Sequence, residues 1–182
     1  MSRLPGVPLD VAWPDVPAPA RTTLAAQVGE LLTTLHRVRP PVMPGWYPDM
    51  AWPEFVVRQR AACEQSQRGL GLAPEWAGQI PGFLGSVTFP DEEPVLLHTE
   101  VMRQHLLVEP GPWRLAGLID FEPAMCGARE YEFAAVGAFF SEGDSGLLRQ
   151  VLTSYGHHLD DGLPGGCSPG CCCTATAACP GT

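Results

Sequence analysis

The 182-residue sequence contains no lysine, because all eleven of its basic residues are arginine. Twenty acidic residues leave the chain with a formal net charge of −9. Nucleic acids and anionic membranes are bound by clustered basic surfaces, so we expect neither of them as a partner. An acidic protein suits a cationic ligand, although acidity also aids solubility without any ligand.

The sequence also lacks long apolar runs and a signal peptide. Its first fifteen residues contain Pro5, Pro8 and Pro14 and no apolar core of signal-peptide length. The most apolar stretch, residues 133–140, is too short to span a bilayer. We therefore expect a cytoplasmic protein. The seven cysteines are an odd number, which in that compartment does not indicate a disulfide framework.

Length and composition predict one folded domain with two flanking segments. Residues 1–20 are rich in proline and predict an extended connector on the surface. Residues 21–158 carry helical and strand patterns and predict the folded lobe. Residues 159–182 contain five of the seven cysteines but no amphipathic pattern, which predicts a disordered tail. One hypothesis is that this tail is a non-native reading frame joined to a truncated domain.

The spacing of apolar residues predicts an α+β fold that is mainly α, with a small β element. Leu24, Val28, Leu31 and Leu35 recur at helical spacing, and prolines follow them. Three short apolar runs indicate buried strands, and Glu-Pro-Gly-Pro at 109–112 indicates a turn that joins two of them into a hairpin. The expected helices cover residues 21–38, 52–68, 74–84, 131–140 and 146–155, and the expected strands cover 95–97, 106–108 and 115–119.

Two acidic residues follow strands of this β element. Glu100 lies between His98 and His105 in the turn after the first strand, and Asp120 lies at the exit of the last one. Strands hold such groups rigidly while loops leave them open, so the two carboxylates are expected to converge. Phosphoryl transfer needs this arrangement, because one carboxylate accepts the proton of the attacking hydroxyl and others hold the metal that neutralises the phosphates.

These residues resemble the signature of the aminoglycoside phosphotransferase family and its protein-kinase-like relatives, in particular the hygromycin-phosphotransferase-like branch. The signature is His-x-Asp, then Asn five residues on, and Ile-Asp-Phe at the end of the next hairpin strand. The corresponding residues are His98-Thr99-Glu100 with His105, and Ile119-Asp120-Phe121. Similarity covers about residues 1–156: residues 1–6 resemble the segment leaving the interlobe hinge, 31–38 a helix ending in Leu-His, and 127–135 the segment Gly-Asp-Pro-x-Tyr-Asp-Leu-Ala.

The resemblance implies the C-terminal lobe of a small-molecule kinase. It implies that the γ-phosphate of ATP is transferred, with Mg²⁺, to a hydroxyl of a cationic substrate such as an aminoglycoside. In the catalytic loop, residues 98–105, Glu100 takes the place of the catalytic aspartate, His105 that of the metal-binding asparagine, and His98 braces the loop. Asp120, in the strand end at 118–122, matches the aspartate that binds magnesium.

Two of these positions depart from the family pattern. Glu100 is one methylene longer than aspartate, which shifts its carboxylate by about an ångström. His105 offers nitrogen where Mg²⁺ prefers oxygen. Family members also carry an N-terminal lobe whose glycine-rich loop and lysine hold the nucleotide, and this sequence contains no lysine. We therefore expect the chain alone to be a weak or inactive kinase, unless a separately encoded N-terminal lobe completes it.

Three alternatives stay open. The first is a catalytically inactive protein, or a substrate-binding remnant, of the same fold. The others are metalloenzymes that use His98 and Glu100, either with Pro169 and the cysteines at 171–173 in a zinc deaminase motif, or with His157 in an iron site. Each of these side chains also has an ordinary interpretation as a solvated, capping or strand-edge residue.

Surface and core interpretations also compete at other positions. Glu122 follows Asp120 closely and is expected at the surface rather than at a metal. Four aromatic residues could line a substrate groove, but aromatics in such loops and helices more often belong to a core. They are Trp46, Tyr47, Trp52 and Trp76.

Overall fold

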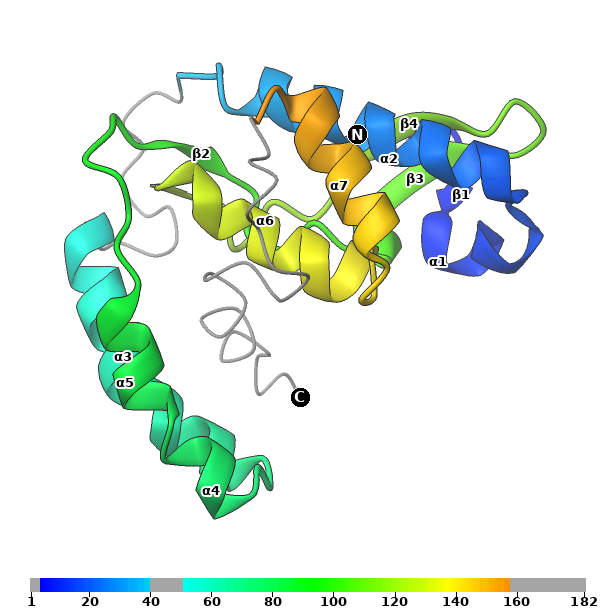
Figure 1. Cartoon of the computed structure of the whole chain (residues 1–182). Helices are drawn as coiled ribbons and strands as arrows, with labels where there is room; N and C mark the ends of the chain where they lie inside the picture. Colours follow the sequence, from blue (N-terminus) through cyan, green and yellow to red (C-terminus); the bar gives the residue numbers. More distant parts are fainter. Residues whose placement is uncertain (1–3, 40–50, 158–182) are drawn as a thin grey trace.

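The structure, a computed structural model, describes residues 4–39 and 51–157. Within them the fold is mainly helical with two small antiparallel sheets, as the sequence predicts (Figure 1). The predicted tail at 159–182 and the residues Trp46 and Tyr47 lie outside the described residues. None of the described helices is long and apolar enough to cross a membrane.

The beginning of the described chain differs from the predicted extended connector. It forms the strand β1 (Val7–Pro8) and two helical turns, α1 (Leu9–Ala12) and η1 (Trp13–Asp15). Leu9 is fully buried, and Ala12 and Val16 lie with it in the main core. These three residues are three and four positions apart, which is the spacing of one helix face. The prolines stand before or at the start of each turn, where a helix tolerates them.

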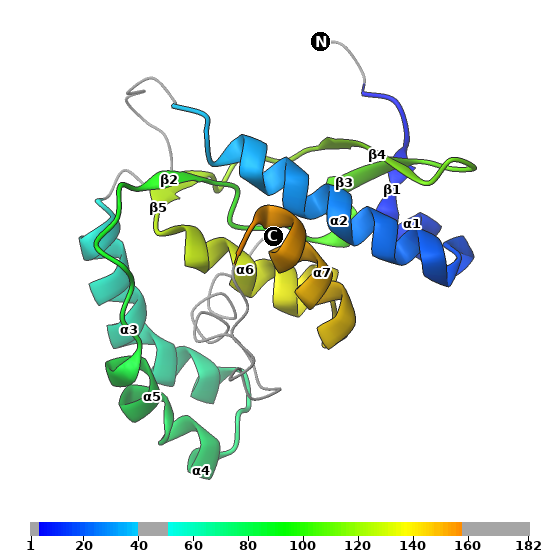
Figure 2. The same ribbon diagram turned by 45° about the horizontal axis from the view of Figure 1, so that its top comes forward.

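Two long helices pack side by side (Figures 1 and 2). They are α2 (Ala18–Leu35), which lies slightly before the predicted span 21–38, and α7 (Ser145–Tyr155). The Asp144 side chain caps the start of α7 by accepting bonds from two backbone N–H groups, and Gly156 ends it with a φ of 90°. The helix pair closes one side of the main core, and α2 also contacts the hairpin.

The predicted hairpin is present. β3 (Leu106–Glu109) pairs with β4 (Arg114–Leu118), and β1 joins the other edge of β3. β2 (Val95–Leu97) instead pairs with β5 (Met125–Gly127), a short strand ending in glycine that the sequence did not predict. Because this pair is antiparallel, the end of β2 meets the start of β5. The loop after β2 therefore lies beside the segment that follows β4.

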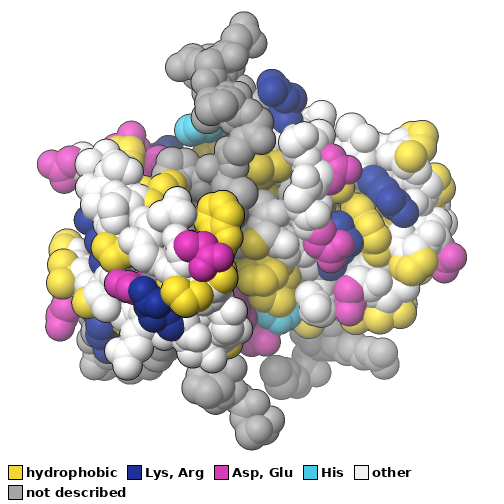
Figure 3. Space-filling view, turned by 60° about the horizontal axis from the view of Figure 1, so that its bottom comes forward, with side chains coloured by type: hydrophobic (Ala, Val, Ile, Leu, Met, Phe, Trp, Pro, Cys, Tyr) yellow, Lys and Arg dark blue, Asp and Glu magenta, His cyan; other side chains and the backbone are white. Residues whose placement is uncertain are grey.

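An arm of three helices projects from the rest of the described chain (Figures 1 and 2). α3 (Trp52–Gly69) matches the predicted helix at 52–68, whereas the predicted helix at 74–84 is divided into α4 (Pro74–Ala77) and α5 (Ile80–Ser86). Figure 3 shows hydrophobic side chains exposed among charged ones on one face of the molecule. The exposed large hydrophobic residues of the arm are Val57, Leu70, Leu72, Trp76 and Phe83.

Aromatic residues join the base of the arm to the lobe. Trp52 stacks on Phe55 and meets Phe89 and Tyr131 edge to face, with ring centroids 5.2 to 5.6 Å apart. Aromatic pairs at such distances stabilise a fold beyond the area that they bury. Trp52 thus belongs to a second core cluster, whereas Trp76 is 62% exposed.

The predicted helix at 131–140 is irregular. A 3-10 turn, η3 (Arg129–Tyr131), leads into α6 (Glu132–Ala135), and the chain then widens into a π-helical turn, η4 (Val136–Phe140). Such turns occur frequently at functional sites because they redirect backbone groups. Both α6 and η4 contact the predicted catalytic loop.

Candidate active site

His98 is buried where the two candidate segments meet. Its Nε2 donates a hydrogen bond to the carbonyl of Ile119 (2.8 Å), and its Nδ1 accepts one from the backbone N–H of Glu100 (3.3 Å). Burial lowers the pKa of His98 below its usual value, which favours the neutral ring that these two bonds require. His98 therefore ties the loop that carries Glu100 to the segment that carries Asp120.

His105 lies between the two candidate carboxylate positions. It ends η2 (Arg103–His105), its Nδ1 donates to the carbonyl of Glu100 (2.9 Å), and its Nε2 lies 3.5 Å from Oδ2 of Asp120. Asp120 has a φ of 66°, and its side chain is 49% exposed. The structure thus brings the backbone of Glu100 together with the side chains of His105 and Asp120, and Glu100 and Asp120 are both accessible to solvent.

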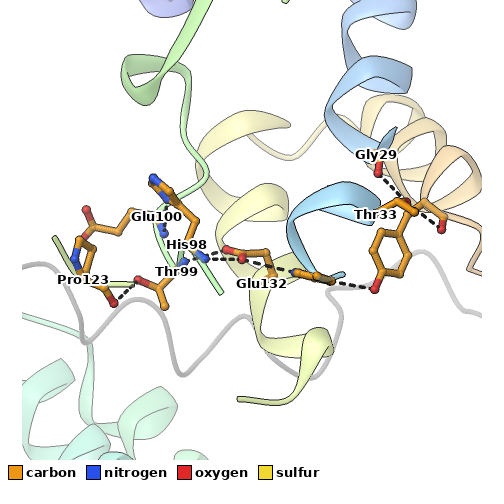
Figure 4. Close-up of polar contacts among 9 residues, drawn as sticks. Gly29, Thr33, His98, Thr99, Glu100, Pro123 and Glu132 are labelled. Carbon is orange, nitrogen blue, oxygen red and sulfur yellow. Dashed lines mark hydrogen bonds and ion pairs between the residues drawn. The ribbon is translucent and has the colours of Figure 1, made fainter. Parts of the chain in front are cut away.

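Glu132, which was not among the predicted site residues, holds the predicted catalytic loop. It is fully buried, and its Oε2 accepts from the backbone N–H of His98 (2.7 Å) while Oε1 accepts from that of Thr99 (2.8 Å) (Figure 4). Thr99 has a φ of 71°, which is rare for a β-branched residue, so the two bonds stabilise a strained turn. The available signal was that Tyr131-Glu132 stands where the family segment has Tyr-Asp.

His36 and Tyr155 lie behind Glu132. Nδ1 of His36 shares a 2.8 Å hydrogen bond with the Tyr155 hydroxyl, and its Nε2 lies 3.6 Å from Oε2 of Glu132. Burial raises the pKa of Tyr155, which keeps its hydroxyl protonated. Since His36 follows α2 and Tyr155 ends α7, the helix pair is linked to the loop through Glu132.

Arg103 anchors the other end of the loop. Its Nε donates to the carbonyl of Phe140 (2.9 Å), and its Nη1 pairs with Glu142 (2.7 Å). The guanidinium carbon lies 3.9 Å from the centre of the Trp13 ring, and the side chain is only 8% exposed. Cation–π contacts are strongest when water is excluded in this way. No motif indicated this anchor, because Trp13 stood in the predicted surface connector.

The metalloenzyme alternatives find no assembled site in the part of the chain that the structure describes. Within residues 4–39 and 51–157, no group of three or more His, Cys, Asp or Glu side chains could hold a metal ion. His157 is therefore not brought together with His98 and Glu100, and both ring nitrogens of His98 are already hydrogen-bonded. Pro169 and the cysteines at 171–173 lie outside the described residues. Glu122 is exposed, as expected.

A cavity of about 520 Å³ lies at the ends of α2 and α7, beside the hydrogen bond between His36 and Tyr155. His36 and Tyr155 line it, together with Arg129 and Glu92, which form an ion pair of 2.7 Å. Neither Glu100 nor Asp120 belongs to its wall. Both residues therefore lie outside this cavity, where Asp120 is exposed and Glu100 partly exposed.

The fold is similar to solved phosphotransferases. The GDP complex of aminoglycoside 2'-phosphotransferase-IIIa is 18% identical, with a TM-score of 0.64 over 85% of this chain and 53% of that one. Macrolide 2'-phosphotransferase MphH from Brachybacterium faecium is 21% identical, with a TM-score of 0.61 over 97% and 59% of the two chains. Aminoglycoside phosphotransferase APH(3'')-Id from Streptomyces rimosus is 16% identical, with a TM-score of 0.58 over 97% and 67%.

These similarities show the fold, and the chain spans only between 53% and 67% of the length of the three solved proteins. No match was found among curated proteins. The family model described as the phosphotransferase enzyme family matches residues 1–166. The predicted family and the mainly helical, kinase-like fold are thus confirmed, and the chain belongs to the phosphotransferase enzyme family.

Proposed function

We propose that the chain is the carboxylate-bearing lobe of an O-phosphotransferase, which moves the terminal phosphoryl group of a nucleoside triphosphate to a hydroxyl of a small molecule. The observation that carries the proposal is that the His105 ring contacts both the backbone of Glu100 and the side chain of Asp120. His98 ties the same two segments together. Transfer of this kind depends on holding the nucleophile and the phosphate-binding metal in a fixed relation.

Glu100 is proposed to orient the attacking hydroxyl and accept its proton. Its backbone N–H is held by His98 and its carbonyl by His105, while its side chain is partly exposed. A carboxylate on such a fixed backbone can meet a substrate from the open side. General base catalysis by a positioned side chain contributes a factor of about 10²–10⁴ in rate.

Asp120 is proposed to hold the divalent cation that neutralises the phosphates of the donor. The family resemblance implies Mg²⁺ at Asp120 and His105. Asp120 offers the carboxylate oxygen that Mg²⁺ prefers, but the atom that faces it is a nitrogen of His105. Because His105 and Asp120 offer one nitrogen and one oxygen, they do not provide the all-oxygen ligands that Mg²⁺ prefers.

The proposed donor is ATP, and the proposed acceptor is a cationic molecule such as an aminoglycoside. The net charge of −9 supports a cationic acceptor. Similar solved proteins are described with GDP, ATP or ADP and with kanamycin or streptomycin. Because the sequence contains no lysine, we propose that a separate N-terminal lobe supplies the glycine-rich loop and lysine that hold the nucleotide.

Transfer of the labelled γ-phosphate of ATP and of GTP tests the proposal. The chain, supplied with the nucleotide-binding N-terminal lobe of a family member, is assayed against a panel of aminoglycosides and macrolides, with Mg²⁺, Mn²⁺ or Co²⁺ present. We expect product formation to fall by at least about 100-fold in Glu100→Gln and in Asp120→Asn. Glu122→Gln, which neutralises the exposed neighbouring carboxylate, is the matched control and should keep the activity. Phosphorylation that survives Asp120→Asn unchanged would contradict the assignment.

A catalytically inactive protein of the same fold is the second candidate. The departures from the family pattern at Glu100 and His105 favour it, together with the lack of lysine. This candidate predicts no product with any nucleotide and metal even when an N-terminal lobe is supplied, while an aminoglycoside still raises the midpoint of thermal unfolding. Saturable binding without turnover would support it, and turnover that is lost in Asp120→Asn would rule it out.

A further inference from the structure

The side chains of His105 and Asp120 form a donor pair that suits a metal other than Mg²⁺. We propose that the two residues bind a divalent first-row transition-metal ion, such as Co²⁺, in preference to Mg²⁺. The inference rests on the proposed function only in placing this ion beside a phosphate donor. Binding itself requires neither nucleotide nor turnover.

The protonation of the His105 ring leaves one nitrogen free for a metal. Nδ1 lies 2.9 Å from the carbonyl oxygen of Glu100. A carbonyl can only accept a hydrogen bond, so Nδ1 carries the proton and the lone pair of the neutral ring is on Nε2. Metal-binding histidines characteristically donate their second N–H to a backbone carbonyl or a carboxylate in this way. The ring is thus prepared to bind an ion through Nε2.

The distance between the two donor atoms fits a shared ion. Nε2 of His105 lies 3.5 Å from Oδ2 of Asp120. Two ligands at right angles, each about 2.1 Å from a metal, lie about 3 Å apart, so a small side-chain rotation brings both onto one ion. Asp120 is 49% exposed, which leaves room for water or phosphate oxygens to complete the coordination.

The chemistry of the donors decides which ion is preferred. Mg²⁺ binds oxygen ligands and gives up its water reluctantly, whereas imidazole is a ligand of transition metals. His105 stands where the resembled family has asparagine, so a nitrogen replaces an amide oxygen. That exchange weakens binding of Mg²⁺ and strengthens binding of Co²⁺. With only two protein ligands, the affinity for Co²⁺ should be modest.

An ion pair between protonated His105 and Asp120 would explain the same proximity without any metal. In that state Nε2 carries a proton and has no lone pair to offer. The two interpretations differ in one measurable property, which is whether Co²⁺ binds at Nε2 at neutral pH.

Titration of the full chain with CoCl₂ and, separately, with MgCl₂ tests the proposal without nucleotide. Histidine ring signals are followed by NMR, because paramagnetic Co²⁺ perturbs nearby nuclei even when it binds weakly. We expect Co²⁺ to perturb the His105 ring first among the histidines. In His105→Asn, the ratio of Co²⁺ to Mg²⁺ affinity should fall by at least about tenfold. His157→Asn, which removes an exposed histidine elsewhere, is the matched control and should keep the ratio.

The unchanged chain and the two histidine variants all contain the seven cysteines, so Co²⁺ bound by thiols affects the three measurements equally. An unchanged affinity ratio in His105→Asn, or no effect of millimolar Co²⁺ on the His105 ring, overturns the proposal in favour of the ion pair. The failure of the proposed function is distinguishable. If the chain binds Co²⁺ through His105 but transfers no phosphate with the N-terminal lobe supplied, only the proposed function is refuted. If Mg²⁺-supported transfer is equally fast in His105→Asn, only the proposed metal preference is refuted.

Discussion

The buried carboxylate of Glu132 accepts a hydrogen bond of 2.7 Å from the backbone N–H of His98. The same side chain accepts a second bond, of 2.8 Å, from Thr99, whose φ of 71° is in the left-handed region. One residue of α6 thereby satisfies one buried and one partly buried N–H group of the loop that carries Glu100. The conformation of this loop is therefore set by a distant helix as well as by its own sequence.

Replacing Glu132 with alanine should destabilise the protein strongly. The change leaves the N–H groups of His98 and Thr99 without a partner and opens a cavity, which we expect to lower the free energy of unfolding by about 2–4 kcal/mol. Urea denaturation measures this loss. Glu130→Ala, two residues away and only half-buried, is the control, and its effect should stay within about 0.5 kcal/mol. Equal stability of the two variants would show that the carboxylate does not hold the loop.

Replacing Arg103 with lysine should loosen the other end of the loop although it keeps the charge. Lysine cannot stack on Trp13 and at the same time donate to the carbonyl of Phe140, as the planar guanidinium does. We expect a loss of about 1–3 kcal/mol and faster hydrogen exchange at the backbone amides of residues 99–105. Glu142→Gln is the comparison, because this partner is 60% exposed and its ion pair should contribute less than about 1 kcal/mol. Unchanged exchange rates in Arg103→Lys would contradict the anchoring role.

The sequence predicted the local elements well and the contacts between them poorly. Helical spacing located α2 and α7, and the Pro-Gly turn located the hairpin, because these signals depend on neighbouring residues. β5 has only three residues, and its pairing with β2 depends on a partner far along the chain. The helical turns of α1 were hidden by prolines, although Leu9 and Val16 have the spacing of a buried face.

The candidate site shows the same division. Glu100, His105 and Asp120 could be chosen from the sequence because they stand in a short motif with fixed spacing. Glu132 and Arg103 could not be chosen on physical grounds, because both depend on contacts between distant parts of the chain. Glu132 acts on the loop from α6, and Arg103, within the loop, binds the carbonyl of Phe140. The partners of the buried Glu132 carboxylate are backbone N–H groups, so no oppositely charged residue in the sequence indicates its role. Only the likeness of residues 127–135 to a family segment pointed towards Glu132.

The stability of the protein should fall as the pH drops below 6.5, the ordinary pKa of histidine. Burial lowers the pKa of His98, so in that range the unfolded chain takes up a proton that the native chain resists. The contribution of the neutral His98 ring to the free energy of unfolding is therefore complete above pH 6.5. It is lost as the pH falls towards the lowered native pKa, by no more than about 1.4 kcal/mol per pH unit. Unfolding free energies of the wild type and of His98→Gln, measured from pH 7.5 to 5.5, should converge at low pH. Parallel curves would mean that the buried ring does not resist protonation.

Gly29 and Gly82 should respond to alanine in opposite directions. A Cβ at Gly29 would lie 2.9 Å from both Cβ of Ser154 and the backbone N of Tyr155, and closer still to the carbonyl oxygen of Val151. Because these atoms belong to α7, Gly29→Ala forces α2 and α7 apart, and we expect a loss of about 1–3 kcal/mol despite the better helix propensity of alanine. The Cβ of Gly82→Ala, on α5, meets no atom within 4 Å, so the same change should stabilise the protein by about 0.5–1 kcal/mol. Chemical denaturation of both variants measures the difference.

Since His36 and Tyr155 connect this helix pair to Glu132, Gly29→Ala should also speed hydrogen exchange at Thr99, which Gly82→Ala should leave unchanged. Protection of Thr99 that is identical in the two variants would show that the loop is held independently of the packing between α2 and α7.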